Sequence, residues 1–126
     1  MRIRLTSVMV DNQEKALEFY TSILGFVKNK DIPMGEHKWL TVVSPESDEI
    51  ELLLEPMAFA PAKVFQKALF DAGIPATAFN VEDVHKEYER LKALGVQFSM
   101  PPTNMGVVTL AVLNDTCGNN IQLIQV

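Results

Sequence analysis

The sequence predicts an α+β fold made of two tandem β-α-β-β-β modules. One observation is an internal repeat, in which residues 50–54 (IELLL) recur 71 residues later as 121–125 (IQLIQ), and Met34-Gly35 recurs at the same offset as Met105-Gly106. The other is that both halves alternate between the two-residue period of strands and the period of a helix. A module of about 55 residues buries little surface alone, so we expect the two modules to share a core or a sheet.

Each element of the first module has its own signal. Asp11 or Asn12 suits a helix N-cap, an apolar stripe at helical spacing follows, and Gly25 ends the helix. A loop with Pro33 and Gly35 then precedes two strands. The expected elements are a strand at 3–10, a helix at 13–24, a short strand at 26–30, and strands at 37–43 and 49–55.

The second module repeats this order, and an additional helix precedes it. The expected elements are a strand at 76–81, a helix at 84–94, a short strand at 96–99, and strands at 107–113 and 120–126. Between the modules, Pro61 suits a first helical position and Gly73 a helix end. The expected buried stripes are Val64, Phe65, Ala68, Leu69 and Ala72 in this bridging helix, and Val84, Tyr88, Leu91 and Leu94 in the next.

These boundaries predict one domain over residues 1–126, with module one at about 1–58, the bridging helix at about 61–73 and module two at about 75–126. The Leu-Gly step that ends each module's helix, Leu24-Gly25 and Leu94-Gly95, recurs at an offset of 70 rather than 71. One residue is therefore lost before this step and regained in the loop that follows.

The composition excludes some classes of function. A hydrophobic content of 48 %, a charged content of 21 % and a net charge of -5 describe an ordinary globular protein whose basic residues are scattered. We therefore expect no nucleic-acid partner and no membrane partner.

The single cysteine, Cys117, excludes an internal disulfide and lies in a turn with no base beside it, so we expect it to be inert. With no long apolar leader at the start, we expect a cytoplasmic protein.

Two motifs carry a resemblance to a known superfamily. Residues 10–26 (VDNQEKALEFYTSILGF) look like the opening signature of the vicinal oxygen chelate superfamily, with the pair Phe19-Tyr20 five residues before Leu24-Gly25. Residues 115–123 (DTCGNNIQL) look like its closing turn. The superfamily includes glyoxalase I, bleomycin-resistance proteins and extradiol dioxygenases. The resemblance implies a curved mixed sheet around a central cup, with the helices on the outer face, and a homodimer.

The resemblance also implies four metal-ligand positions, which fall on Leu5, Glu51, Ala76 and Gln122. The offset of 71 relates Leu5 to Ala76 and Glu51 to Gln122, so the two pairs check one another. Leucine and alanine have no donor atom, and a catalytic zinc site uses three protein ligands. We therefore expect no metal and no other cofactor, and keep a divalent metal at a rearranged site as the alternative.

Strand alternation predicts which side chains line the cup. The expected lining residues are Leu5, Ser7, Met9, Trp39, Glu51, Leu53, Ala76, Ala78, Asn80, Gln122 and Ile124. Met34 and Phe59 are expected either to add to its wall or to fill a core. Mostly apolar surface with a few polar groups is typical of a small-molecule site.

Glu51 is the candidate catalytic residue. A carboxylate among apolar side chains is expected to pair with a group such as Gln122, to bind a cation, or to have a raised pKa. A neutral acid at this position could donate to a ligand carbonyl, and a poised carboxylate could remove a proton. The alternative is a glutamate at a strand end that reaches solvent.

Three functions remain open at this point. The first is a metal-free protein that binds a small molecule, as in the bleomycin-resistance branch, whose cationic ligands fit the acidic net charge. The second is an enzyme, either a metal-dependent lyase or dioxygenase of the glyoxalase type, or a metal-free enzyme with Glu51 as acid or base. The third is an interaction domain, although no exposed apolar stripe in the sequence supports it.

Overall fold

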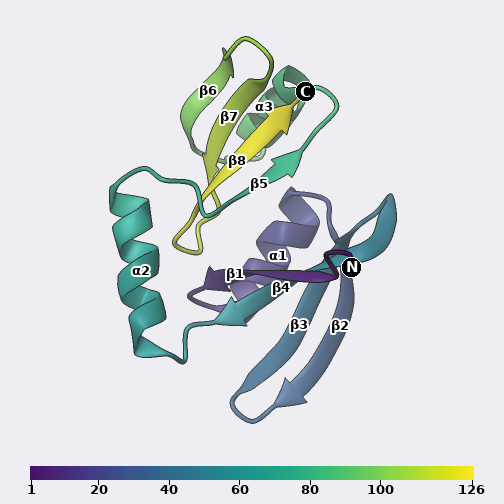
Figure 1. Cartoon of the computed structure of the whole chain (residues 1–126), viewed down its shortest axis with the longest axis vertical. Coiled ribbons are helices and arrows are strands. Elements are labelled where there is room, and N and C mark those ends of the chain that lie inside the picture. Colours follow the sequence, from purple (N-terminus) through teal and green to yellow (C-terminus); the bar gives the residue numbers. More distant parts are fainter. The chain divides into compact units, whose positions relative to one another are not determined.

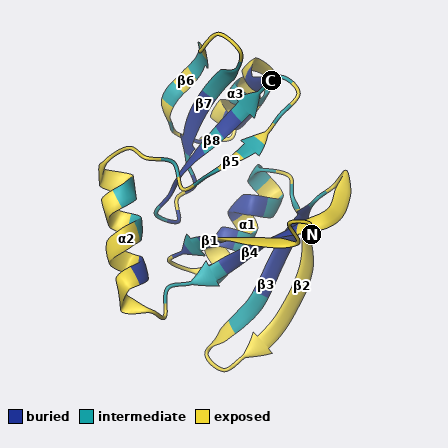
Figure 2. Cartoon of the chain, in the orientation of Figure 1, coloured by how far each residue is buried: buried dark blue, intermediate teal, exposed yellow.

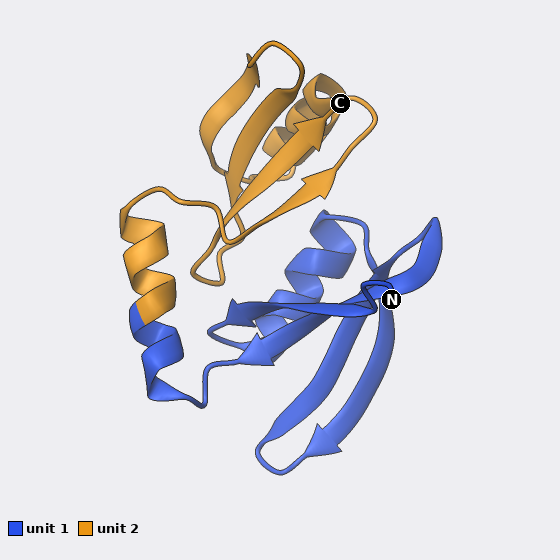
Figure 3. Cartoon of the chain, viewed as in Figure 1, with its two compact units in different colours: residues 1–64 blue, residues 65–126 orange.

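The computed structural model describes all residues, 1–126, as two compact units, Met1–Val64 and Phe65–Val126 (Figure 3). The elements of the first unit are β1 (Leu5–Val10), α1 (Gln13–Glu18), the π-helical turn η1 (Phe19–Ile23), β2 (Val27–Met34), β3 (His37–Ser44) and β4 (Ser47–Pro56). The helix α2 (Ala60–Asp71) includes the boundary between the units. The second unit continues with β5 (Thr77–Asn80), α3 (Val84–Ala93), β6 (Phe98–Asn104), β7 (Thr109–Asn114) and β8 (Asn120–Gln125).

Each unit contains one mixed sheet of four strands (Figure 1). The strand orders are β1-β4-β3-β2 and β5-β8-β7-β6, and the first strand of each module pairs in parallel with the last. All other pairs are antiparallel. The same connectivity in both units confirms the predicted α+β fold of tandem β-α-β-β-β modules. None of the helices is long and apolar enough to span a lipid bilayer.

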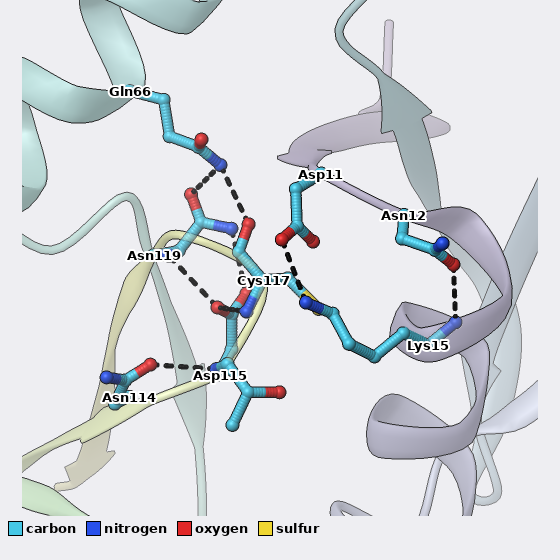
Figure 4. Close-up of polar contacts among 9 residues, drawn as sticks. Asp11, Asn12, Lys15, Gln66, Asn114, Asp115, Cys117 and Asn119 are labelled. Atoms are coloured by element: carbon cyan, nitrogen blue, oxygen red, sulfur yellow. Dashed lines mark hydrogen bonds and ion pairs between the residues drawn. The ribbon is translucent and has the colours of Figure 1, made fainter.

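The helices α1 and α3 begin with the same kind of side-chain cap. The side chain of Asn12 accepts a hydrogen bond from the backbone N–H of Lys15 at 2.9 Å, and Asp83 accepts one from Lys86 at 3.1 Å (the first pair is drawn in Figure 4). Both contacts satisfy an N–H that has no partner within its helix. The predicted cap at Asn12 is therefore correct, and both caps lie at the repeat offset of 71.

The end of the first module's helix explains why the Leu-Gly step recurs at an offset of 70 rather than 71. In η1 the N–H of Leu24 donates to the carbonyl of Phe19, five residues earlier, at 3.0 Å. A π-helical turn accommodates one extra residue within a helix. The segment from Asn12 to Gly25 is one residue longer than that from Asp83 to Gly95, and η1 is where the first module contains the additional residue.

The core of each unit lies between one face of its sheet and one helix. In the first unit this layer comprises Val8, Val10, Ala16, Tyr20, Leu40, Val42, Leu52 and Leu54. In the second it comprises Val84, Leu91, Ala111, Leu113, Ile121 and Leu123. Burying a side chain of this size contributes about 1.5–3 kcal/mol, so these layers supply most of the stability of each unit.

Two details of the predicted stripes are wrong. Leu94 is 50 % exposed because α3 ends at Ala93 and Leu94 already lies in its C-cap. In α2, Val64 and Phe65 are 72 % and 63 % exposed. Ala68 and Ala72 are exposed as well, Leu69 is half-buried, and Ala62 is the buried residue. The amide of Gln66 donates to the carbonyl of Cys117 at 3.1 Å, so polar contacts as well as apolar spacing set which face of α2 is covered (Figure 4).

Candidate functional site

The first sheet has an open face opposite α1. Residues that pair directly in a sheet share a face, so the pairs Leu5 with Glu51 and Ser7 with Leu53 place all four side chains on this side. Thr41 pairs with Leu53, which puts Thr41 on the same face. Figure 2 shows that β2, at the edge of the sheet, is exposed along its length. On this face Leu5 and Ser7 are exposed, whereas Thr41, Glu51 and Leu53 are buried.

The predicted lining residues divide between the two sheets. The open face of the first sheet carries Leu5, Ser7, Met9, Trp39, Glu51 and Leu53. In the second sheet, Ala78 pairs with Gln122 and Asn80 with Ile124, and the N–H of Ala76 donates to the carbonyl of Asn120 at 2.8 Å. Ala76, Ala78 and Asn80 are exposed, whereas Gln122 and Ile124 are half-buried.

Three other residues discussed from the sequence are at or near the surface of the first unit. Trp39 is half-buried on the open face. Met34 and Phe59 are 58 % and 72 % exposed, so neither fills a core in this chain. Trp39 is therefore the aromatic residue that the open face presents.

Glu51 is the buried charge of the open face. Glu51 is 3 % exposed, so the predicted alternative of a glutamate that reaches solvent is wrong. One carboxylate oxygen, Oε1, accepts hydrogen bonds from Asn29 Nδ2 at 2.7 Å and Thr41 Oγ1 at 2.8 Å. The other, Oε2, accepts from Lys30 Nζ at 2.9 Å and lies 4.0 Å from Arg4. Four residues from β2, β3 and the N-terminal segment surround this carboxylate.

Of the three outcomes expected for Glu51, the structure shows pairing, with Lys30 as the partner in place of Gln122, and not a raised pKa. The hydrogen bonds from Lys30 and Thr41 lower the pKa of Glu51 from 4.5 to about 2, with smaller contributions from Asn29 and from the charge of Lys30. Burial acts in the opposite direction but is outweighed. The raised pKa that the sequence suggested is therefore wrong, and Glu51 is ionised at neutral pH.

A β-bulge allows two consecutive residues to reach Glu51. Neighbouring residues of a regular strand point to opposite faces, but the register of β2 against β3 shifts between Lys28 and Asp31. Asn29 and Lys30 lie inside this irregularity, and both side chains bond Glu51. Neither residue was predicted as a partner of Glu51, because no pattern of apolar residues marks a bulge.

The second module does not contain an equivalent cluster. Gln122 occupies the position of Glu51, and Leu110 pairs with Ile124 as Thr41 pairs with Leu53. An amide and a leucine therefore replace the carboxylate and the hydroxyl. The repeat retains the scaffold, whereas the charged cluster belongs to the first module alone.

The four positions at which the resemblance implies metal ligands form a poor donor set. Leu5 and Ala76 present only hydrocarbon, and Gln122 offers a neutral amide. The carboxylate of Glu51 has three hydrogen-bond donors on its two oxygens, one of them the cationic Lys30. A metal at Glu51 would have to displace these donors and accept a positive ammonium group beside it. These residues do not fit the metal.

A separate groove of about 650 Å³ lies in the first unit where α1 begins. Gln13 helps to form this groove. Its side-chain amide donates hydrogen bonds to the carbonyls of Lys38 in β3 and Leu54 in β4, and accepts one from the N–H of Lys38. His37 also lines this groove and is exposed. The groove contains none of the predicted lining residues and combines carboxylates with lysines.

Known proteins and one family model match the sequence of this chain. The family model described as "Glyoxalase/Bleomycin resistance protein/Dioxygenase superfamily" matches residues 2–123. YurT of Bacillus subtilis (strain 168), a protein without a described function, is 55 % identical over 99 % of both chains. A lactoylglutathione lyase of Neisseria meningitidis serogroup B is 30 % identical and covers 99 % of this chain and 91 % of its own.

A solved structure is also similar. TnmS3, an antibiotic binding protein from Streptomyces sp. CB03234, matches with a TM-score of 0.77 and 28 % identity, covering 99 % of this chain and 95 % of its own. The family match spans nearly the whole sequence and both modules. The chain therefore belongs to the glyoxalase/bleomycin resistance protein/dioxygenase superfamily.

Proposed function

We propose that this protein binds a small organic molecule on the open face of the first sheet, without the metal that the family resemblance implies. The observation that carries the proposal is the environment of Glu51. Both oxygens of its carboxylate are engaged by Asn29, Lys30 and Thr41, and the neighbouring position is Leu5. The similarity to TnmS3, an antibiotic binding protein, supports a binding role.

The open face has the composition of a binding surface. The exposed Leu5 and the half-buried Trp39 supply apolar contact area. Glu51 and its partners Arg4, Asn29, Lys30 and Thr41, here called the Glu51 cluster, supply polar groups at one place. Small-molecule sites combine these two features, because apolar area gives affinity and a few fixed polar groups give orientation.

The alternative is an enzyme, and the similarity to a lactoylglutathione lyase is the observation that favours it. The low pKa of Glu51 makes this carboxylate a weak base, and its ionised state prevents it from acting as an acid at neutral pH. An assay for lactoylglutathione formation, with added nickel or zinc, tests this alternative. We expect no product above that of a protein-free control, and turnover that depends on Glu51 would favour the enzyme.

Trp39 is the only tryptophan of the chain, so its fluorescence reports on the open face. The neutral aromatic probe N-phenylnaphthylamine accepts energy from tryptophan, and we expect its titration to quench Trp39 to saturation. Ser7→Glu places a charge on the open face and is expected to weaken the probe's binding at least tenfold. The matched control is Thr6→Glu, at the neighbouring exposed residue of the same strand, whose side chain points to the opposite face. Equal binding by the two variants would place the site elsewhere.

We also propose that the protein is a homodimer. Apolar side chains on and before α2 support this, because Phe59, Val64 and Phe65 are each more than half exposed in the single chain. Sedimentation equilibrium at micromolar concentration is expected to give twice the mass of the chain. A monomer at that concentration would contradict the proposal.

A further inference from the structure

The Glu51 cluster offers a ligand hydrogen-bond donors rather than an acceptor, because both oxygens of the Glu51 carboxylate already accept hydrogen bonds from the protein. The ammonium group of Lys30 carries three N–H donors and makes one hydrogen bond to the protein, to Glu51 Oε2 at 2.9 Å. The Lys30 side chain is 43 % exposed. Arg4 lies 4.0 Å from the same oxygen and its side chain is 69 % exposed. A molecule on the open face therefore meets two cationic donors there, while Glu51 itself is buried.

The position of Lys30 is fixed from two sides. Its backbone N–H donates to Thr41 Oγ1 at 3.1 Å, and the same hydroxyl donates to Glu51. A flexible lysine loses much rotamer freedom when it binds a ligand, and a fixed partner removes part of that cost in advance. Glu51 therefore orients Lys30 as well as neutralising it.

We infer that the ligand of the open face is an apolar molecule that bears an anionic oxygen group, such as a carboxylate, sulfonate or phenolate, and that Lys30 is the residue that selects this group. The inference rests on the proposed function and deepens it. It also reverses the expectation of a cationic ligand from the net charge of -5, since the local cluster and the whole chain differ in sign. The other carboxylates of β4 are Asp48, Glu49 and Glu55, which lie three, two and four residues from Glu51, towards the two ends of the strand.

A pair of probes isolates the contribution of the anionic group. Anilinonaphthalene sulfonate and N-phenylnaphthylamine share the same ring system and differ by the sulfonate, and quenching of Trp39 reports binding of both. The quantity measured is the ratio of the two dissociation constants in each protein variant. This ratio cancels the apolar contribution that the probes have in common.

Lys30→Met retains an unbranched side chain but removes the donors and the charge. We expect it to lower the preference for the sulfonate probe about tenfold, the usual effect of losing one charged hydrogen bond, with little change in binding of the neutral probe. The control is Lys28→Met, on the same strand and 52 % exposed, whose side chain shares the opposite face with Val42. We expect this control to leave the preference unchanged.

Two further variants keep the test decisive if Lys30→Met folds poorly with Glu51 unpaired. Glu51→Gln removes the negative charge and leaves both cations, so it is expected to maintain or raise the preference for the sulfonate. The double variant Lys30→Met with Glu51→Gln has no unpaired carboxylate, and we expect it to lose the preference. If the site instead selected cations, Glu51→Gln would weaken the binding of a cationic ligand and would not strengthen the binding of the sulfonate probe.

The possible failures are distinct. If the neutral probe binds the open face but the preference for the sulfonate is the same in the wild type, Lys30→Met and the double variant, the inference about Lys30 is wrong and the proposed function stands. If neither probe quenches Trp39, the proposed function is wrong and this inference falls with it. A preference lost in the Lys30 variants and kept in Lys28→Met supports both.

Discussion

Lys30 Nζ lies 2.9 Å from Glu51 Oε2, although the two residues belong to β2 and β4, which are separated in the sheet by β3. The contact passes over Thr41 of β3, whose hydroxyl bonds both residues. Three strands are thus connected by side chains on the open face as well as by backbone hydrogen bonds. This arrangement makes Glu51 a structural carboxylate that presents cations to the surface, and it leads to the predictions that follow.

The stability of the protein is expected to depend on pH through Glu51. Its pKa is about 2 in the folded state and 4.5 as an unperturbed group, so the folded protein binds this proton less readily than the unfolded chain. The stabilisation is therefore complete above pH 4.5 and is lost as the pH falls towards 2. Urea unfolding of the wild type and Glu51→Gln should show a stability difference that shrinks across this range. A difference independent of pH would contradict the low pKa.

Removing the hydroxyl of Thr41 should destabilise the first unit. Thr41→Val has nearly the same shape, but it leaves Glu51 with one donor fewer and the N–H of Lys30 without its acceptor. We expect a loss of about 1–3 kcal/mol in the free energy of unfolding, measured with urea. The control, Thr6→Val at an exposed position of the same sheet, should change it by less than about 0.5 kcal/mol. Equal effects would show that the cluster does not stabilise the sheet.

Asp115 should be the most sensitive polar residue of the second unit. Its buried carboxylate accepts hydrogen bonds from the N–H groups of Cys117 and Asn119 and from the Asn119 side chain, at 2.8 to 3.0 Å (Figure 4). Asp115→Ala leaves these donors unsatisfied and is expected to cost roughly 2–4 kcal/mol in the free energy of unfolding. Asp71→Ala removes an exposed carboxylate from α2 and should cost less than about 0.5 kcal/mol. An equally mild Asp115→Ala would mean that the turn forms without its carboxylate.

Cys117 should be unreactive in the folded protein. Its side chain is fully buried in the turn between β7 and β8, so a thiol reagent cannot reach the sulfur without local opening. Ellman's reagent is expected to react slowly with the native protein and completely once it is unfolded in urea. Fast stoichiometric labelling of the native protein would show that this turn opens readily.

The fold was predictable because its signals are local and occur twice. The repeat, the Asn12 cap and the glycine stops each depend on a few neighbouring residues, and the structure places the elements close to where these residues indicated. The one-residue difference between the repeats was also visible, but its cause, the π-helical turn η1, was not. A shift of helical register leaves the apolar pattern nearly unchanged.

The face on which these strand residues lie was predictable, but the surroundings of Glu51 were not. The residues of β1 and β4 follow from strand alternation, so Leu5, Ser7, Glu51 and Leu53 share a face as expected. The partners of Glu51 could not be found in this way, because they depend on a bulge in β2. The structure extends β2 to Met34, through Pro33, which an edge strand tolerates since it has one unpaired side.

Metal-free binding on the open face is best tested by titrating N-phenylnaphthylamine into protein treated with a metal chelator, with Trp39 fluorescence as the readout and the metal content measured on the same sample. We predict saturable quenching at one probe per chain in metal-free protein, unchanged when zinc, nickel, manganese or iron is added back. Binding that appears only with stoichiometric metal and is lost in Glu51→Gln would contradict the claim.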